Sequence, residues 1–124
     1  MNIADIATEE FIQVDTDERL GKVRSIFERE NPKGIVVTEG GAYAGILTER
    51  QLIQSHIADD AKVNVLARNN VPRVEREANI RDVARMLVEG GTKVAPVFED
   101  GDLWGIVTED EILDAVLDNL DVLP

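Results

Sequence analysis

The 124-residue chain contains no cysteine, only one histidine, four prolines, one tryptophan, one tyrosine and three phenylalanines. The absence of cysteine excludes disulfide bonds, thiolate metal sites and cysteine nucleophiles. The single histidine, His56, excludes a metal site built from several histidines. No apolar run approaches the ~20 residues that a membrane-spanning helix needs. The chain therefore offers few of the side chains on which covalent and metal-dependent catalysis depend.

Positive charge is also scarce, because 13 lysines and arginines stand against 25 aspartates and glutamates, a formal net charge of −12. The arginines are scattered and form no basic stripe, so we expect no nucleic-acid partner. Acid-rich, lysine-poor composition is typical of proteins from salt-loving organisms, where ~1 M salt shortens the Debye length to ~3 Å. An ordinary acidic protein is the equally open alternative. Residues 1–10 lack the basic stretch of a secretory signal, so we expect a cytoplasmic protein without a membrane partner.

The chain is an internal repeat with an offset of 60 residues. The segment AGILTE at 44–49 matches WGIVTE at 104–109, and the same offset pairs Lys33 with Lys93 without a gap. Apolar positions match while polar positions drift, which is what two copies of one fold show, because the core restricts sequence more than the surface does. We therefore divide the chain into repeats at 1–60 and 61–124, which together form one module.

Each repeat is predicted to have the order β-α-β-β-α. Apolar residues at helical spacing indicate a first helix, and a strand pair joined by a two-residue turn follows. In the first repeat these elements cover 12–14, 20–27, 34–37, 43–47 and Thr48 to about Ile57, with the turn at Gly40-Gly41. In the second they cover 72–74, 80–87, 94–98, 103–107 and Thr108 to about Leu120, with the turn at Asp100-Gly101. A unit of ~60 residues is marginal alone, so we expect an α/β fold of two pseudo-symmetric repeats packed through their sheets.

This pattern resembles a tandem pair of cystathionine-β-synthase (CBS) domains, a Bateman module. The resemblance rests on Lys93-Val-Ala-Pro-Val97, the Asp100-Gly101 turn and Gly105-Ile-Val-Thr108. A weaker copy is formed by Lys33-Gly-Ile-Val-Val37, Gly40-Gly41 and Gly45-Ile-Leu-Thr48. The resemblance to the CBS pair covers residues 3–120, essentially the whole chain.

The resemblance implies a regulatory role rather than catalysis. CBS pairs typically bind AMP, ADP, ATP or S-adenosylmethionine in clefts between the repeats, and they commonly form homodimers. No catalytic residue, metal ligand or required cofactor is implied. Such modules control an effector domain or a partner protein, and the ending Asp-Asn-Leu-Asp-Val-Leu-Pro124 is expected to lead into a further domain.

The family pattern also implies two shared ligand clefts. In each cleft one repeat supplies adenine contacts and the other supplies a Thr-containing motif for phosphate and ribose. The resemblance places Thr48, Arg50, Gln51, Ala67, Pro72, Thr92, Lys93 and Val94 in one cleft. It places Ala7, Ile12, Pro32, Lys33, Gly34, Thr108 and Glu111 in the other.

The sequence departs from this pattern at the ribose-binding aspartate, which is replaced by Gln51 and Glu111. Both Thr48-Glu-Arg-Gln51 and Thr108-Glu-Asp-Glu111 also fit a capping box, in which the fourth side chain bonds back to the threonine N–H. Capping is preferred for these side chains, and the threonine hydroxyls remain available for either role.

The cleft of Thr48 is the better candidate for an anionic ligand. It would combine Arg50, Lys93 and nearby Arg73, whereas the cleft of Thr108 would combine Lys33 with Asp110 and Glu111. For both lysine side chains, an ordinary solvated position at a strand start stays open as the alternative.

Two other functions remain to be weighed. A CBS pair with degenerate sites would act as a ligand-free dimerisation scaffold, which Gln51 and Glu111 favour. A hydrolase using Glu49 and Glu109 is not favoured, because both acids fall in helix first turns, where acids are common. We expect His56 at a helix end, Trp104 in packing or an interface, and Gly45 and Gly105 at close backbone approaches.

Overall fold

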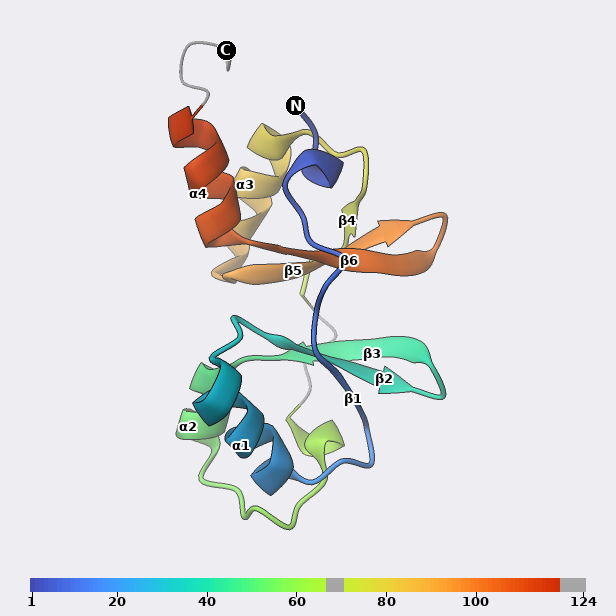
Figure 1. The fold of residues 1–124 in the computed structure, drawn as a ribbon, viewed down its shortest axis with the longest axis vertical. Helices are drawn as coiled ribbons and strands as arrows, with labels where there is room; N and C mark the ends of the chain where they lie inside the picture. Colours follow the sequence, from blue (N-terminus) through green and yellow to red (C-terminus); the bar gives the residue numbers. More distant parts are fainter. Residues whose placement is uncertain (67–70, 119–124) are drawn as a thin grey trace. The chain divides into compact units, whose positions relative to one another are not determined.

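The computed structural model describes residues 1–66 and 71–118, which belong to two compact units (Figure 1). The first-repeat unit is Phe11–Asn70. The second-repeat unit combines Val71–Pro124 with Met1–Glu10. The first ten residues therefore belong to the same unit as the second repeat.

The first-repeat unit is a three-stranded sheet covered on one face by two helices (Figure 1). The central strand pairs in parallel with the first strand and antiparallel with the third. Its elements are β1 (Gln13–Asp15), α1 (Leu20–Glu30), β2 (Ile35–Glu39), β3 (Ala42–Leu47), α2 (Glu49–Ser55) and the 3-10 turn η2 (Val63–Val65).

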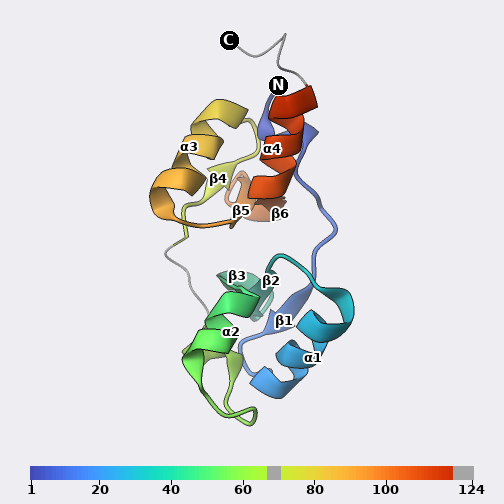
Figure 2. The ribbon, with the colours of Figure 1, turned by 90° about the vertical axis from the view of Figure 1, so that its left-hand side faces the viewer.

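The second-repeat unit repeats this topology, with a parallel pair and an antiparallel pair sharing the central strand. Figure 2 shows its two helices side by side on one face of the sheet. Its elements are η1 (Ile3–Asp5), β4 (Val74–Glu75), α3 (Ile80–Gly90), β5 (Val94–Glu99), β6 (Asp102–Thr108) and α4 (Glu109–Asp118). The predicted β-α-β-β-α order and mixed α/β class are confirmed in both repeats.

Both hairpins turn at the predicted dipeptides. Gly40 and Gly41 have φ of 58° and 87°, and Asp100 and Gly101 have φ of 51° and 87°. Two consecutive left-handed residues form the type of turn whose twist matches that of the flanking strands. Each hairpin also carries a register shift at the same repeat position, between Val37 and Thr38 and between Val97 and Phe98.

Each unit has its own apolar core between the sheet and its helices. The helix residues predicted from their spacing are buried, with the exception of Met86, which is half-buried. The core of the first-repeat unit contains Leu20, Val23, Phe27, Ile35, Val37, Leu47 and Leu52. That of the second-repeat unit contains Ile80, Val83, Leu87, Ala95, Val97, Val107 and Ile112.

The N-terminal segment lies against the outer strand of the second-repeat unit. Thr8 and Ile106 exchange two backbone hydrogen bonds, both 3.0 Å long. A Cβ atom added to the neighbouring Gly105 would lie 2.3 Å from the carbonyl oxygen of Thr8. The close backbone approach predicted at Gly105 is therefore confirmed, and the approaching backbone is that of Thr8 and Glu9.

We predict that Gly105→Ala destabilises the protein by about 1–3 kcal/mol, because the new methyl group meets backbone that cannot rotate away. Gly90→Ala is the matched control, since its Cβ would meet nothing closer than 3.7 Å. That substitution is expected to be neutral or slightly stabilising, because alanine favours helix. Urea unfolding of both variants measures the difference, and equal stabilities would contradict the close approach.

Candidate functional site

The junction between β3 and α2 holds the first of the two predicted threonine motifs. The backbone N–H of Thr48 donates to Gln51 Oε1 at 2.7 Å, and Gln51 N donates to Thr48 Oγ1 at 3.4 Å. The Thr48 hydroxyl also lies 3.3 Å from Gln51 Oε1. These reciprocal bonds form a capping box that satisfies backbone donors at the start of the helix.

The junction between β6 and α4 repeats this arrangement with a carboxylate. Thr108 N donates to Glu111 Oε1 at 3.0 Å, the Thr108 hydroxyl donates to the same oxygen at 3.1 Å, and Glu111 N donates to Thr108 Oγ1 at 3.2 Å. The capping role preferred for Gln51 and Glu111 is therefore confirmed. The two boxes differ in charge, because Gln51 is neutral whereas Glu111 places a carboxylate beside the threonine.

Each unit brings its own threonine motif next to the start of its central strand. In the second-repeat unit Val94 pairs with Thr108, and Glu109 N donates to the Lys93 carbonyl at 2.9 Å. In the first-repeat unit Ile35 pairs with Leu47, so Gly34 and Thr48 follow at the same edge of the sheet. Both classes of predicted ligand contact, adenine and phosphate, thus lie at one sheet edge in each repeat.

The remaining predicted residues lie around these edges. Ile12 and Pro72 are half-buried, and the Ile12 carbonyl accepts a hydrogen bond from Val36 N at 2.9 Å. Ala7 packs against the core of the second-repeat unit. Thr92 donates its hydroxyl to the Val94 carbonyl at 2.9 Å. Arg50, Lys33 and Lys93 are exposed and Pro32 is half-buried, while Ala67 lies outside the described residues. The combination of one repeat's threonine with the other repeat's lysine stays a prediction.

Arginine side chains lie over the rings of Phe98 and Trp104 in the second-repeat unit. The Arg73 guanidinium carbon lies 4.5 Å from the centroid of Phe98, and that of Arg76 lies 5.0 Å from the centroid of Trp104. Arg76 also forms an ion pair with Glu99 at 2.8 Å. Trp104 packs against the apolar core, so the packing role predicted for it is confirmed.

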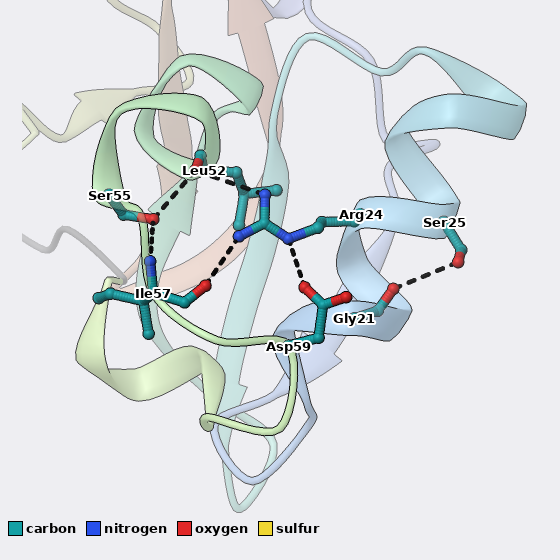
Figure 3. Close-up of polar contacts among 7 residues, drawn as sticks. All are labelled: Gly21, Arg24, Ser25, Leu52, Ser55, Ile57 and Asp59. Atoms are coloured by element: carbon teal, nitrogen blue, oxygen red, sulfur yellow. Dashed lines mark hydrogen bonds and ion pairs between the residues drawn. The ribbon is translucent and has the colours of Figure 1, made fainter.

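Arg24 is an organising residue that the sequence analysis missed (Figure 3). From α1 its guanidinium donates to the carbonyls of Leu52 at 3.4 Å and Ile57 at 3.0 Å, and to Asp59 at 2.7 Å. A cation suits this position, because carbonyls at a helix C-terminus lack partners and carry partial negative charge. The available signal was a mismatch, since the repeat partner of Arg24 is Ala84.

The helix that Arg24 caps is short, and its end is well defined. α2 ends at Ser55, and His56 follows with φ of 55°, which confirms the predicted position of the histidine at a helix end. In the second repeat α4 continues to Asp118, so the carbonyl of Ile112, the counterpart of Leu52, can accept a hydrogen bond from within the helix. For the Leu52 carbonyl, Arg24 therefore supplies a donor of the kind that the longer helix supplies in the second repeat.

The described residues contain no group of three or more histidine, cysteine, aspartate or glutamate side chains placed to hold a metal ion. Glu49 and Glu109 are exposed in the first turns of their helices, as predicted. No helix within residues 1–66 or 71–118 combines the length and apolarity needed to cross a membrane.

Comparison with known proteins identifies the repeats. The family model described as "CBS domain" matches residues 3–57 and again 62–118. An A-adding tRNA nucleotidyltransferase from Aquifex aeolicus is 25% identical over 99% of this chain, and the chain spans 14% of that protein's length.

Two solved structures extend the likeness to three dimensions. The cytosolic domain of the Mg2+ channel MgtE in complex with ATP is 27% identical, with a TM-score of 0.78 over 92% of this chain and 48% of that chain. A CBS domain pair in complex with 5′-methylthioadenosine and S-adenosyl-L-methionine is 18% identical, with a TM-score of 0.85 over 95% of this chain and 97% of that chain.

We predict that Arg24→Met destabilises the protein by about 1–3 kcal/mol, because the carbonyls at the end of α2 lose a charged donor while the aliphatic stem is kept. Asp59→Asn is the control, since the Asp59 side chain is 69% exposed and its ion pair is worth at most about 1 kcal/mol. Thermal unfolding compares the two. A larger loss for Asp59→Asn would contradict the capping role of Arg24.

Proposed function

The chain belongs to the CBS domain family, and we propose that it serves as a regulatory module that binds an adenine nucleotide or S-adenosylmethionine. The observation that carries this proposal is the 27% identity to an MgtE cytosolic domain solved with ATP. The duplicated threonine motifs at sheet edges support it, because a threonine at a helix N-terminus offers a hydroxyl and backbone N–H groups to an anion. Binding of the ligand would change the activity of an attached domain or of a partner protein.

We propose that the ligand phosphate is held at Thr48 rather than at Thr108. A phosphate oxygen can replace the neutral Gln51 amide oxygen as the acceptor for Thr48 N–H. At Thr108 the corresponding position holds the Glu111 carboxylate, which would repel a phosphate at short range. Arg50 and Lys93 are exposed and are the proposed cationic partners, with Thr92, Val94 and Pro72 near the adenine.

The second candidate function is a ligand-free scaffold that holds two copies of the chain together. The observation in its favour is that both Gln51 and Glu111 are already engaged in capping boxes. Side chains held there are not available to bond ribose hydroxyls unless the box opens. The two functions differ in whether any adenine compound binds.

Calorimetric titration with AMP, ADP, ATP and S-adenosylmethionine, at 0.1 and 1 M NaCl, tests the proposal. We expect at least one of them to bind with micromolar affinity and to raise the melting temperature in proportion to RT ln(1 + [L]/Kd). Thr48→Ala is expected to weaken binding by about tenfold or more, the loss of ~1.4 kcal/mol from an anion contact.

Thr48→Ser is the matched control, because serine keeps both the helix cap and the hydroxyl. It should bind nearly as well as the wild type. If Thr108→Ala abolishes binding and Thr48→Ala does not, the ligand occupies the other site. The absence of binding by all four compounds, in a folded protein, would leave the scaffold function.

A further inference from the structure

The segment that follows α2 is held to the first-repeat unit by polar contacts. Residues 56–62, here called the strap, connect the end of α2 with η2. No side chain from residue 53 to residue 62 is buried, and the nearest buried side chains are Leu52 before this stretch and Val63 after it. Because exposed hydrogen bonds and ion pairs are each worth little, the strap depends on several of them acting together.

The strap supplies hydrogen-bond acceptors for the start of α1. The backbone N–H of Leu20 donates to the Ala61 carbonyl at 2.9 Å. The backbone N–H of Gly21 donates to the Asp59 carbonyl, also at 2.9 Å. Arg19, the residue before the helix, makes no capping bond with its side chain. The first backbone donors of α1 therefore find their partners in a segment about 40 residues later in the chain.

The second repeat solves the same problem locally. Asn79, the counterpart of Arg19, caps α3 with its own side chain, which accepts a hydrogen bond from Arg81 N at 2.8 Å. Arg81 is in turn the counterpart of Gly21, whose donor is bound by the strap in the first repeat. Only in the first repeat, among the described residues, does the first helix take this cap from the segment that follows the second helix.

Arg24 connects the strap to the end of α2 (Figure 3). Its guanidinium donates to the Leu52 carbonyl in α2, to the Ile57 carbonyl just beyond the helix, and to the Asp59 carboxylate in the strap. Leu52 is the one buried residue of this seven-residue helix. Because so short a helix is not stable alone, α2 depends on Leu52 and on the contacts at its two ends. Release of the strap would therefore also weaken α2.

We propose that α2 and the strap open and close as one cooperative unit, which couples the Thr48 motif to the start of α1. Thr48 and Gln51 cap the beginning of α2, and Arg24 holds its end against the strap. The strap carbonyls in turn bind the backbone donors of Leu20 and Gly21. Segments that bury few apolar side chains open locally while the rest of the fold stays intact. A change at Thr48 therefore reaches α1 through α2 and the strap.

This unit gives the ligand site a means of regulation, a consequence that rests on the proposed function. A ligand that contacts Thr48 favours the closed unit, because the geometry of the motif exists only while α2 is formed. By linkage, such a ligand stabilises every hydrogen bond that closes together with α2, including those between the strap and α1. Occupancy of the site is then reported as the ordering of the strap, without a rearrangement of the sheet.

Amide hydrogen exchange of the whole chain, followed by NMR, tests the coupling without any ligand. Thr48→Ala removes the cap at the beginning of α2 and should speed exchange of the Leu20 and Gly21 amides by about fivefold, the effect of a lost helix cap. Thr48→Ser keeps the cap and should leave both amides within about twofold of wild type. The Asn31 amide, which bonds to the Phe27 carbonyl at the other end of α1, should not change.

Arg24→Met gives an independent check from the other end of α2. It should speed exchange of the α2 amides and of Gly21, because the link between helix and strap is lost. Arg29→Met is the matched control on the same helix, since Arg29 is exposed and donates to the Ser25 carbonyl of α1 itself at 3.3 Å. That variant should change neither set of amides.

Faster exchange in α2 with unchanged Leu20 and Gly21 amides overturns the proposal. Equal acceleration at Asn31 also overturns it, because the first-repeat unit would then open only as a whole.

ATP is the probe for the regulatory consequence. At a concentration a hundredfold above its calorimetric Kd, it should slow exchange of the Leu20 and Gly21 amides by up to about a hundredfold. ATP that binds without slowing these two amides overturns the regulatory consequence. A failure of ATP to bind counts against the proposed ligand alone, because exchange in the ligand-free variants decides whether α2 and the strap are coupled.

Discussion

The hydrogen bonds between a threonine and the side chain three residues later determine where each repeat changes from strand to helix. Thr48 directly follows β3 and Thr108 is the last residue of β6, and in both repeats the helix begins at the residue after the threonine. Because the boxes bind the first backbone donors, the helices start in register with the buried residues Leu52 and Ile112. The same bonds place helix N-termini beside the central strands, so the geometry that stabilises the fold also creates the anion-binding candidates.

Much of this architecture could be predicted from local sequence. Two-residue turns that require positive φ located the hairpins, and the apolar spacing of Leu20, Val23 and Phe27 located the first helix. The capping boxes could be predicted because each involves two residues that are three positions apart in the sequence. The partners in interactions between distant segments could not be predicted: Gly105 indicated a close backbone approach but not that Thr8 makes it, and the contact of Arg24 with Ile57 leaves no local pattern. The candidate site was predictable only as two lists of residues, because its assembly depends on such long-range placement.

Because the chain contains two copies of one fold, each position in one repeat can be compared with its equivalent in the other. Positions that agree between the repeats, such as the threonines and the buried valines, report what the fold requires. Positions that disagree report where the copies have taken different roles. The change from Gln51 to Glu111 alters the charge beside an otherwise similar cap. Arg24 donates hydrogen bonds to α2 and to Ile57, whereas its counterpart Ala84 packs against the apolar core of its unit. The asymmetry lies in side chains on a shared backbone plan, so the two repeats need not act alike.

The placement of Met1–Glu10 in the second-repeat unit means that this unit is built from two separate stretches of the chain, whereas the first-repeat unit is one continuous stretch. A fragment beginning at residue 61 would contain the α-helices and strands of the second-repeat unit but would lack η1, and β6 would lack the backbone partner supplied by Thr8. An unpaired outer strand is a template for intermolecular pairing. A gene rearrangement that separated the second repeat from residues 1–10 would therefore produce a protein that tends to aggregate. Selection would favour inheritance of the two repeats as one unit.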